Sequence, residues 1–443
     1  MNVQKAIVWF RQDLRLHDNE ALAEALKNAD EILPVYVFDE RVFKGQTCWF
    51  NFPKTGAYRA KFIIESVENL RENLRKLGND LVVRVGQPEE IIFELARETG
   101  ASWVFCNRER TTEEVEVQDN LERKLWTIGR EMRYSRGKLL YYTADLPFPI
   151  THTPDAFALF RKEVERYVPI RMPLATPELI PPVKKDIVIG LIPSVTDFGH
   201  DKITPDLRAV LPFKGGENAA LERLHYFLWE TDLVKNYKQS RNELIGGDYS
   251  TKFSPYLAQG CLSPKLIYAE LKRYEQAKGA DKNTYTLFLD LLWRDFFRLM
   301  AKKHEEKIFL RSGTADHKNR IDPSDWQLLS PWLEGKTGQP FIDANMRELK
   351  LTGYLSSKGR QNVASYLVND LQVNWQMGAE YFESMLIDYD VSSNWGNWNH
   401  IAGVGSDTRE MAEVNILHQA KRFDPQGDYV RQWIPELTEL SIP

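Results

Sequence analysis

Short apolar runs alternate with amphipathic stretches over residues 1–140 of the chain. The apolar runs predict strands at 6–10, 32–38, 81–85 and 103–106. The amphipathic stretches, whose apolar positions recur on one helical face, predict helices over 19–28, 57–77, 88–99 and 112–130. Regular alternation of strand and helix is typical of a doubly wound parallel sheet with helices on both faces, so we expect an α/β domain here.

After residue 214 the hydrophobic positions follow a helical period instead. Helices are predicted over 217–232, 263–278, 284–304, 343–351, 360–373 and 376–387. Between the two regions, residues 143–213 hold 11 of the 22 prolines and show little periodicity, which is typical of a long ordered connector. We therefore expect an α/β domain at 1–135, a linker at 136–213 and a larger all-α domain at 214–443.

The composition is that of an ordinary globular protein, with 43% hydrophobic and 27% charged residues. A net charge of −5 argues against a protein that coats nucleic acid by bulk electrostatics, although a local basic groove stays open. Cys48, Cys106 and Cys261 have the spacing of neither a disulfide framework nor a zinc site, so we expect a reducing, cytoplasmic location. Neither a signal peptide nor a membrane-spanning run is evident.

Several common cofactor and catalytic motifs are missing from the sequence. Neither GxGxxG nor a Walker loop occurs, which speaks against an NAD site and against a P-loop. An HExxH motif and Cys/His clusters are also lacking, so no metal site is expected. Without a GxSxG elbow, a serine hydrolase has little support as well.

The segment 248–255, DYSTKFSP, places small hydroxyl side chains and a lysine directly before a helix that is predicted to begin at Pro255. Exposed backbone amides at a helix start, together with a lysine, make a suitable site for a pyrophosphate. The same residues would also form an ordinary capping loop, and the segment alone does not separate the two possibilities.

A second unusual segment, LIDYDVSSNWGNW, covers residues 386–398. It contains two aspartates, two asparagines and two tryptophans within thirteen residues, and its composition predicts a turn-rich loop that closes a core. Polar side chains that are buried in such a place need hydrogen-bond partners. A heterocyclic cofactor with ring N–H and carbonyl groups would provide them.

Taken together and in order, five segments resemble the photolyase/cryptochrome family. They are IVWFRQDLRLHDNEAL (7–22), STKFSPYLAQGCLSP (250–264), FLDLLWRDFFR (288–298), EGKTGQPFIDANMRELKLTGY (334–354) and LIDYDVSSNWGNWNHIAGVGSD (386–407). The resemblance covers nearly the whole chain. Three further segments resemble the DASH branch of that family in particular: FRKEVERYVPIRMPL (160–174), GRQNVASYLV (359–368) and AGVGSD (402–407).

This resemblance implies a folded-over FAD in the helical domain. The residues that would hold its pyrophosphate and ribityl parts are Tyr237, Ser250, Thr251, Lys252, Phe253 and Ser254. The residues that would line the flavin are Arg294, Arg360, Asp388, Asp390 and Asn394. Among these, Arg360 and Asp388 are expected to pair beside the ring, and Asn394 is expected to face the ring nitrogen that gains a proton on reduction.

The resemblance also gives a second interpretation to some of the 12 tryptophans, which would otherwise form an aromatic core. Trp398 and Trp375 match the inner and middle members of the family's electron-hopping chain. The outer member is missing, because Ile321 and Asp322 occupy the stretch where it is expected. Trp326 could substitute for it, although it lies at a different register.

A light-harvesting folate near the α/β domain is a further implication. Glu109, in the segment CNRERTTEEVEV, matches the acidic residue that grips the antenna pterin in DASH relatives. The alternative is a solvated glutamate at the start of a helix. We therefore expect 5,10-methenyltetrahydrofolate as a second chromophore, with Glu109 as its ligand.

Three residues depart from the repair photolyases of the family where the DNA lesion would bind. Asp290 replaces a glutamate and withdraws its carboxyl by roughly 1.5 Å, the length of one C–C bond. Ser357 replaces an asparagine and His400 an aromatic residue, whereas Trp293 keeps its place as a stacking wall.

Two functions stay open on this basis. The first is a cytoplasmic, monomeric blue-light receptor that acts on an unknown signalling partner and retains some DNA binding. The second is a light-driven cyclobutane pyrimidine dimer photolyase, for which flipping a base out is least costly in single-stranded DNA.

Overall fold

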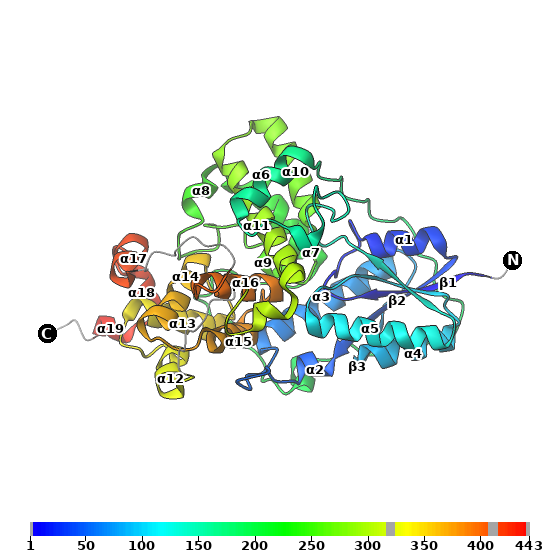
Figure 1. The fold of residues 1–443 in the computed structure, drawn as a ribbon, viewed down its shortest axis with the longest axis horizontal. Coiled ribbons are helices and arrows are strands. Elements are labelled where there is room, and N and C mark those ends of the chain that lie inside the picture. Colours follow the sequence, from blue (N-terminus) through cyan, green and yellow to red (C-terminus); the bar gives the residue numbers. More distant parts are fainter. Residues whose placement is uncertain (1–2, 316–323, 406–414, 440–443) are drawn as a thin grey trace.

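The N-terminal end of the molecule is a parallel β-sheet (Figure 1). The computed structural model describes residues 3–315, 324–405 and 415–439, and in this part of the chain five strands form the sheet, in the order β3-β2-β1-β4-β5. Their bounds are β1 (Lys5–Phe10), β2 (Glu31–Asp39), β3 (Val82–Gly86), β4 (Trp103–Asn107) and β5 (Glu131–Ser135). Every neighbouring pair is parallel. The predicted doubly wound sheet is confirmed.

Helices cover both faces of this sheet: α1 (Glu20–Asn28), α3 (Ala57–Lys76), α4 (Pro88–Thr99) and α5 (Thr112–Thr127), with the short α2 (Glu40–Phe43) after β2. Alternate residues of β1 point to opposite faces. Val8 and Phe10 join the core that contains α1 and α3, whereas Ile7 and Trp9 join the core that contains α4 and α5. Because both faces are buried, the strand is continuously apolar, which is why the sequence pattern located it.

The apolar runs did not predict β5, although it pairs with β4 along its whole length. Its sequence is EMRYS, and only Met132 and Ser135 of these five residues are buried. A strand at the edge of a sheet carries charged residues that discourage pairing with other chains, so it lacks the apolar run of a central strand.

The proline-rich segment was expected to be a connector, and most of it is irregular backbone that runs along the α/β part. Its contact with the sheet includes a hydrogen bond of 2.8 Å from Val83 N to Ile189 O. One helix within it was not predicted, α6 (Phe157–Tyr167), which packs Phe157 and Phe160 against Phe296. The prolines of this segment flank α6 and do not interrupt it, so their number alone was misleading.

The rest of the chain is helical and extends to the opposite end of the molecule, where the C-terminus lies (Figure 1). Its helices are α7 (Glu217–His225), α8 (Tyr237–Ser240), α9 (Ser254–Ala258), α10 (Pro264–Lys278), α11 (Lys282–His304), α12 (Trp326–Glu334), α13 (Pro340–Thr352), α14 (Ser357–Ser365), α15 (Trp375–Met385), α16 (Val391–Ile401), α17 (Ile416–Phe423), α18 (Asp428–Trp433) and α19 (Glu436–Glu439). The helices predicted at 217–232 and 360–373 end in π-helical turns, Tyr226–Glu230 and Tyr366–Asp370. Within the described ranges, no helix is both long and apolar enough to span a bilayer.

Helix α11 joins the helical part to the segment that follows β5. The Asp295 carboxylate accepts hydrogen bonds from the backbone N–H groups of Leu140 (3.0 Å) and Tyr141 (2.9 Å). Arg294 Nη1 donates to the Lys138 carbonyl at 2.7 Å. Burial raises the pKa of Asp295 to about 6 in spite of these donors. The joint between the two parts is therefore built from buried polar contacts.

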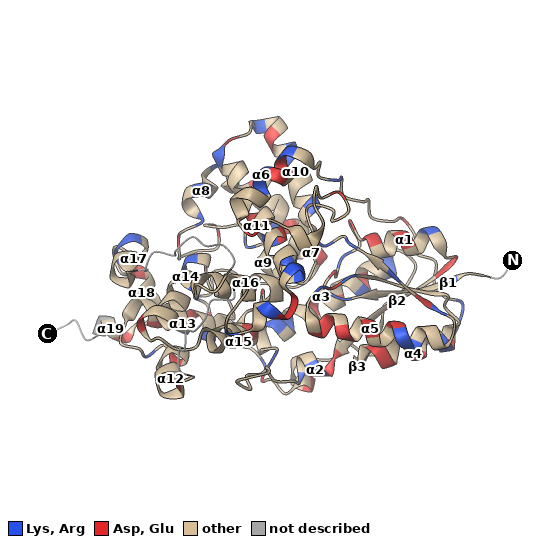
Figure 2. Ribbon diagram, in the orientation of Figure 1, with Lys and Arg blue, Asp and Glu red and all other residues tan. Residues whose placement is uncertain are grey.

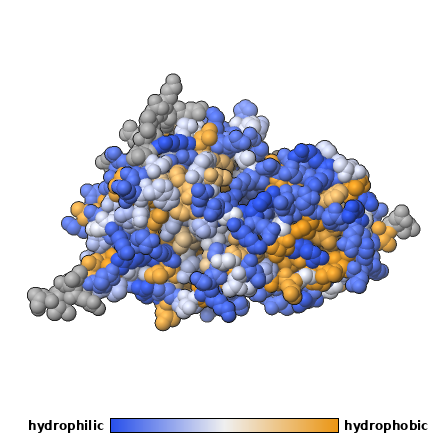
Figure 3. Space-filling view, turned by 90° about the horizontal axis from the view of Figure 1, so that it is seen from below, coloured by the Kyte–Doolittle hydropathy of each residue, from blue (hydrophilic) through white to orange (hydrophobic). Residues whose placement is uncertain are grey.

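The surface charge agrees with the small net charge. Acidic and basic residues are interspersed over both parts of the molecule (Figure 2). Seen from below, hydrophobic side chains gather mainly on the α/β part, at the end near the N-terminus (Figure 3).

Candidate functional site

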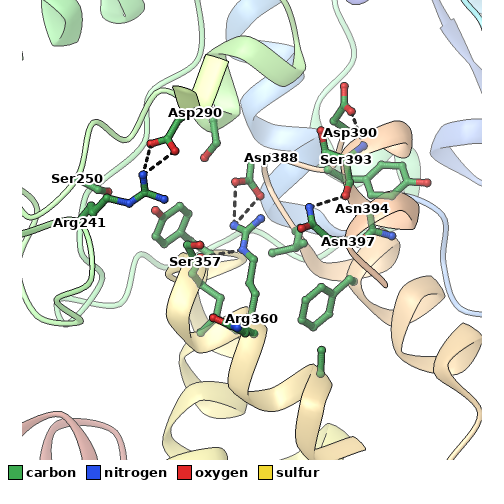
Figure 4. Close-up of a pocket in the computed structure, with 18 of the residues that line it drawn as sticks. Arg241, Ser250, Asp290, Ser357, Arg360, Asp388, Asp390, Ser393, Asn394 and Asn397 are labelled. Atoms are coloured by element: carbon green, nitrogen blue, oxygen red, sulfur yellow. Dashed lines mark hydrogen bonds and ion pairs between the residues drawn. The ribbon is translucent and has the colours of Figure 1, made fainter. Parts of the chain in front are cut away.

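A cavity of about 470 Å³ lies in the helical part (Figure 4). Its walls include the loop before α9, one face of α14, the loop before α16 and one face of α16. Of the residues expected at a cofactor, the cavity brings together Tyr237, Ser250, Thr251, Lys252, Ser254, Arg360, Asp388, Asp390, Asn394 and Trp398. Segments separated by more than a hundred residues therefore meet at one site.

Lys252 gives the cavity an anion-binding character. It is buried with a positive φ of 57°, and its ammonium nitrogen lies 3.1 Å from the centroid of the Tyr249 ring. Within the part of the chain that the structure describes, this nitrogen has no hydrogen-bond partner. Burial lowers the pKa of Lys252 well below its ordinary value. A buried ammonium without a partner, beside the start of α9, fits the pyrophosphate of a dinucleotide cofactor.

The expected contact between Arg360 and Asp388 is present. Arg360 Nη2 donates to both carboxylate oxygens of Asp388, at 2.9 and 2.8 Å, and its Nε donates to the Leu355 carbonyl at 2.9 Å. Burial opposes the charge on Arg360, but the Asp388 carboxylate raises its pKa nevertheless. The carboxylate of Asp388 thereby fixes the Arg360 guanidinium on the cavity wall.

The segment 386–398 was predicted to be a turn-rich loop, and this prediction is wrong for most of it. Residues from Val391 onward form α16, whose N-cap is Asp390: its side chain accepts a hydrogen bond from Ser393 N at 2.9 Å. Helical spacing then places Asn394 and Trp398, four residues apart, on one face that lines the cavity. Composition missed the helix because asparagine, serine and aspartate also favour turns.

Two further contacts fix side chains on the α16 wall. Arg298, on α11, donates to the Asp390 carboxylate at 2.5 Å, and both are buried. Burial alone would raise the pKa of Asp390. The guanidinium groups of Arg298 and Arg294 outweigh this effect, so that the pKa lies well below its ordinary value. Asn394 Nδ2 donates to the Ala379 carbonyl at 3.0 Å, which fixes the plane of its amide.

Some residues that the resemblance implied as flavin ligands lie elsewhere. Phe253 is buried against Phe227, with ring centroids 5.7 Å apart. Arg294 donates to the carbonyls of Lys138 and Leu257, so its guanidinium serves the joint between the two parts. Burial and the neighbouring Arg298 lower the pKa of Arg294 to about 10.

The three residues that depart from the repair photolyases, Asp290, Ser357 and His400, all line the cavity. Trp293 lies against Phe157 instead, with stacked rings whose centroids are 3.6 Å apart. It lines a smaller neighbouring cavity that shares His400 with the first. One face of the expected stacking wall is therefore already covered by a side chain of α6.

Arg241 is a cavity residue that the sequence analysis missed. Its Nη1 donates to both oxygens of Asp290, at 2.6 and 2.8 Å, while the Tyr237 hydroxyl donates to the same carboxylate at 2.6 Å. Burial raises the pKa of Asp290, although Arg241 opposes this effect. The four-residue spacing of Tyr237 and Arg241, at the start and the end of one helical turn, was the signal that could have identified the pair.

The two predicted electron-chain tryptophans, Trp375 and Trp398, lie on the neighbouring helices α15 and α16. Trp375, on α15, is buried, and its indole N–H donates to the Arg311 carbonyl at 3.2 Å. Trp398 packs so closely against α15 that a Cβ at Gly378 would lie 2.3 Å from its ring. Ile321 and Asp322 lie outside the described residues.

Glu109 lies between β4 and α5 and is only 2% exposed, so the interpretation as a solvated glutamate is wrong. Its carboxylate is paired with Lys138, and its backbone N–H donates to Gln118 Oε1 at 2.7 Å. Among the residues of known placement, no group of three or more His, Cys, Asp or Glu side chains is arranged to hold a metal ion.

Comparison with known proteins agrees with this architecture. The family model for DNA photolyase matches residues 6–179, and the model for the FAD binding domain of DNA photolyase matches residues 287–442. Cryptochrome DASH of Xenopus laevis is 46% identical over 437 residues, which are 98% of this chain and 83% of the relative.

Two solved structures are similar over nearly the whole chain. The crystal structure of the Synechocystis sp. PCC6803 cryptochrome has a TM-score of 0.95 and 46% identity, covering 99% of this chain and 90% of that one. An archaeal photolyase from Sulfolobus tokodaii, solved with two FAD molecules, has a TM-score of 0.79 and 27% identity, covering 99% and 91%.

The fold and the cavity together define a flavoprotein in which an α/β domain is joined to a helical FAD-binding domain. The chain belongs to the DASH cryptochromes of the photolyase/cryptochrome family. FAD is accordingly the cofactor of the helical domain. The unpartnered ammonium of Lys252 and the Arg360–Asp388 pair fit the charged and heterocyclic parts of such a cofactor.

Proposed function

We propose that the protein is a blue-light receptor that acts on a signalling partner. FAD supplies a chromophore that absorbs blue light and then accepts one electron. Lys252 and the hydroxyls of Ser250, Thr251 and Ser254, which line the cavity, would hold the pyrophosphate of this cofactor, and Tyr237 would hold its ribityl part. Arg360, which Asp388 fixes on the cavity wall, would favour negative charge on the ring.

The remaining cavity residues serve the same step. The amide of Asn394, which its hydrogen bond to the Ala379 carbonyl fixes, would face the ring nitrogen that takes up a proton. Asp390 keeps α16 in place through its contacts with Ser393 and Arg298. Trp398 and Trp375 pass electrons toward the cavity from the neighbouring helices α16 and α15.

The observation that favours a receptor over a repair enzyme is the position of Asp290. Its shortened carboxylate is bound by Arg241 and Tyr237, at 2.6 to 2.8 Å. A carboxylate held by two donors is poorly placed to bind a lesion as well, and a displacement of about 1 Å in an active site can cost on the order of 100-fold in rate. Trp293, stacked on Phe157, is also engaged elsewhere.

Light-driven repair of cyclobutane dimers in single-stranded DNA is the second candidate. It is favoured by the common position of Asp290, Ser357 and His400 on the cavity that holds the cofactor. The test is to illuminate the reduced holoprotein with a dimer-containing single-stranded oligonucleotide and to follow the recovery of thymine absorbance. Absence of turnover in a protein that binds FAD supports the receptor, and turnover at a rate typical of enzymes would overturn it.

Asp290→Glu is expected to raise any residual repair activity roughly tenfold, because the carboxyl gains reach. The gain stays below the 100-fold that a displacement of about 1 Å can cost, since Ser357 and His400 still differ. Repair rates on the same oligonucleotide provide the measurement, with Asp290→Asn as the control of equal length. Equal rates for the glutamate and asparagine variants would show that carboxylate length is not limiting.

We also infer a site for 5,10-methenyltetrahydrofolate at Glu109. Burial and the neighbouring guanidinium groups of Arg108 and Arg136 lower the pKa of Arg110 to about 10. This local surplus of positive charge would be offset by the carboxylates of a folate, while Glu109 and Lys138 bind the pterin.

Glu109→Gln is therefore expected to weaken folate binding about tenfold or more, because a charged hydrogen bond to the pterin becomes a neutral one. The near-ultraviolet pterin band during titration with the folate measures this, and the FAD content should stay unchanged. Glu114→Gln, at a half-buried neighbour on α5, is the matched control. Equal folate binding by the two variants would exclude Glu109 as the ligand.

Three properties complete the proposal. The domain boundaries are proposed at 1–135, 136–213 and 214–443. We propose a monomer in the cytoplasm, where the free thiols of Cys48, Cys106 and Cys261 would stay reduced. The DNA partner, where one is bound, is proposed to be single-stranded.

A further inference from the structure

Three tryptophans follow one another from the interior of the helical part to the surface. Trp375 and Trp395 are both buried, and their ring centroids are 5.6 Å apart. The centroid of Trp395 lies 5.8 Å from that of Trp49, whose side chain is 47% exposed. Trp375 and Trp395 belong to α15 and α16, whereas Trp49 belongs to the loop between α2 and α3, so two distant parts of the sequence supply this series.

Trp49 is held in place although it lies in a loop. The backbone N–H groups of Trp49 and Phe50 donate to the two oxygens of the Glu380 carboxylate, at 3.0 and 2.9 Å. Glu380 is buried on α15, the helix that also carries Trp375. The loop is thereby anchored to the same helix as the interior end of the series, which keeps the spacing of the three indoles constant.

The middle member, Trp395, also contacts the wall of the FAD cavity. Its indole N–H donates to the Tyr389 hydroxyl at 3.3 Å, and Tyr389 lines the cavity and donates to the Glu383 carboxylate at 2.9 Å. This hydrogen bond fixes the orientation of the Trp395 ring. The indole that connects the interior to the surface is therefore linked by hydrogen bonds to a residue of the cofactor cavity.

A second aromatic series also leads from Trp398 toward the surface, with neighbouring centroids 5.2 to 6.3 Å apart. It runs through Phe382, Trp332, Tyr381, Phe52 and Trp326. Trp326 is 48% exposed, much like Trp49. The two phenyl rings of this series are far harder to oxidise than an indole, so they interrupt the passage of an electron, whereas the first series consists of indoles alone.

We propose that Trp395 and Trp49 form the outer section of the electron path, with Trp49 as its surface terminus. The proposal rests on the proposed function, which supplies the oxidising event at Trp398 and Trp375. One electron passes from Trp395 to oxidised Trp375, and one from Trp49 to oxidised Trp395. Trp49 then loses its indole proton to water. A thiol in solution returns one electron and one proton to Trp49 and becomes a thiyl radical, two of which combine to a disulfide.

The test uses the FAD-loaded protein and the variants Trp49→Phe, Trp326→Phe and Trp126→Phe. Trp126, on α5, is 63% exposed and lies outside both series, so it is the matched control. After a light flash, we expect Trp49→Phe alone to shorten the lifetime of the tryptophan radical severalfold. A second measurement does not depend on the radical lifetime: after illumination in air without thiol, peptide mass mapping should find oxidation products at Trp49 in the wild type.

The possible outcomes separate this inference from the proposed function. If the wild type forms no tryptophan radical, and resembles Trp398→Phe in this respect, the proposed function fails. If radicals form but Trp49→Phe behaves like Trp126→Phe, and no oxidation is found at Trp49, only the surface terminus is wrong. If Trp326→Phe is the variant that shortens the radical lifetime, the path leads through the second series and the proposal is overturned.

Discussion

Asp390→Ala is expected to lower the free energy of unfolding of the flavin-free protein by about 4 kcal/mol. The substitution leaves the Arg298 guanidinium buried, without its carboxylate and close to Arg294. Removing one partner of a buried ion pair is far more costly than removing an exposed one, because the remaining charge stays desolvated. The loss of the N-cap of α16 contributes about 1 kcal/mol of this total.

Urea denaturation followed by circular dichroism measures the change, and two variants separate its causes. Asp390→Asn keeps a side chain that can cap the helix, so it isolates the loss of charge. Asp325→Ala removes the N-cap of α12, whose hydrogen bond to Gln327 N is exposed to solvent, and should cost only about 1 kcal/mol. If Asp390→Ala costs no more than Asp325→Ala, the buried pair contributes little.

The effect of Asp390→Ala should also depend on pH. The pKa of Asp390 in the folded protein is held well below its ordinary value by Arg298 and Arg294. The unfolded chain therefore takes up a proton at this residue before the folded chain does, so the contribution of the pair is lost as the pH falls below about 3.9. The difference in free energy of unfolding between wild type and variant should be constant above about pH 5. It should decrease steadily as the pH falls below about 3.9.

Lys252→Met is expected to weaken FAD binding by about 3 kcal/mol, more than 100-fold, while stabilising the flavin-free protein by about 1 to 3 kcal/mol. The opposite signs have one cause. Without the cofactor, the ammonium is buried with no hydrogen-bond partner among the described residues, which is unfavourable for folding. With the cofactor, the same ammonium is expected to pair with a phosphate, and methionine of similar length cannot replace that contact.

Flavin fluorescence during titration of the apoprotein gives the affinity, and thermal unfolding without FAD gives the stability. Lys238→Met removes an exposed lysine on α8 and should change neither quantity. Because the pKa of Lys252 is lowered by burial, the stabilisation by methionine should narrow as the pH approaches about 10.4, where the unfolded chain also carries a neutral lysine. A variant that binds FAD as tightly as the wild type would contradict the assignment of Lys252.

Periodicity in the sequence was sufficient for the elements that bury a whole face. The central strands and the helices on both sides of the sheet follow apolar patterns that leave few alternatives. It failed where burial is partial or where composition is ambiguous: β5 is a polar edge strand, α6 lies among prolines, and α16 is rich in residues that favour turns. In each of these cases tertiary contacts, which no local pattern contains, decide the conformation.

The candidate site was predicted to a similar extent. Segment resemblance identified most of the cavity lining, including the residues of the Arg360–Asp388 pair. It did not identify Arg241, because its role depends on a partner, Asp290, 49 positions further along the chain. The sequence also could not show that the route to Trp49 consists of indoles alone, whereas the route to Trp326 includes phenyl rings. Both routes arise from helices and loops that meet only in the folded molecule.

The placement of α11 has a consequence for how the molecule comes apart. One continuous rod carries Asp290 on the cavity wall and, one turn further, Arg294 and Asp295, which bond to backbone groups of the segment after β5. If either half detached, buried charged residues of α11 such as Arg294 and Asp295 would lose their hydrogen-bond partners. Melting should therefore be cooperative across the apparent domain boundary, and the two halves behave as one thermodynamic unit, although the sequence divides them.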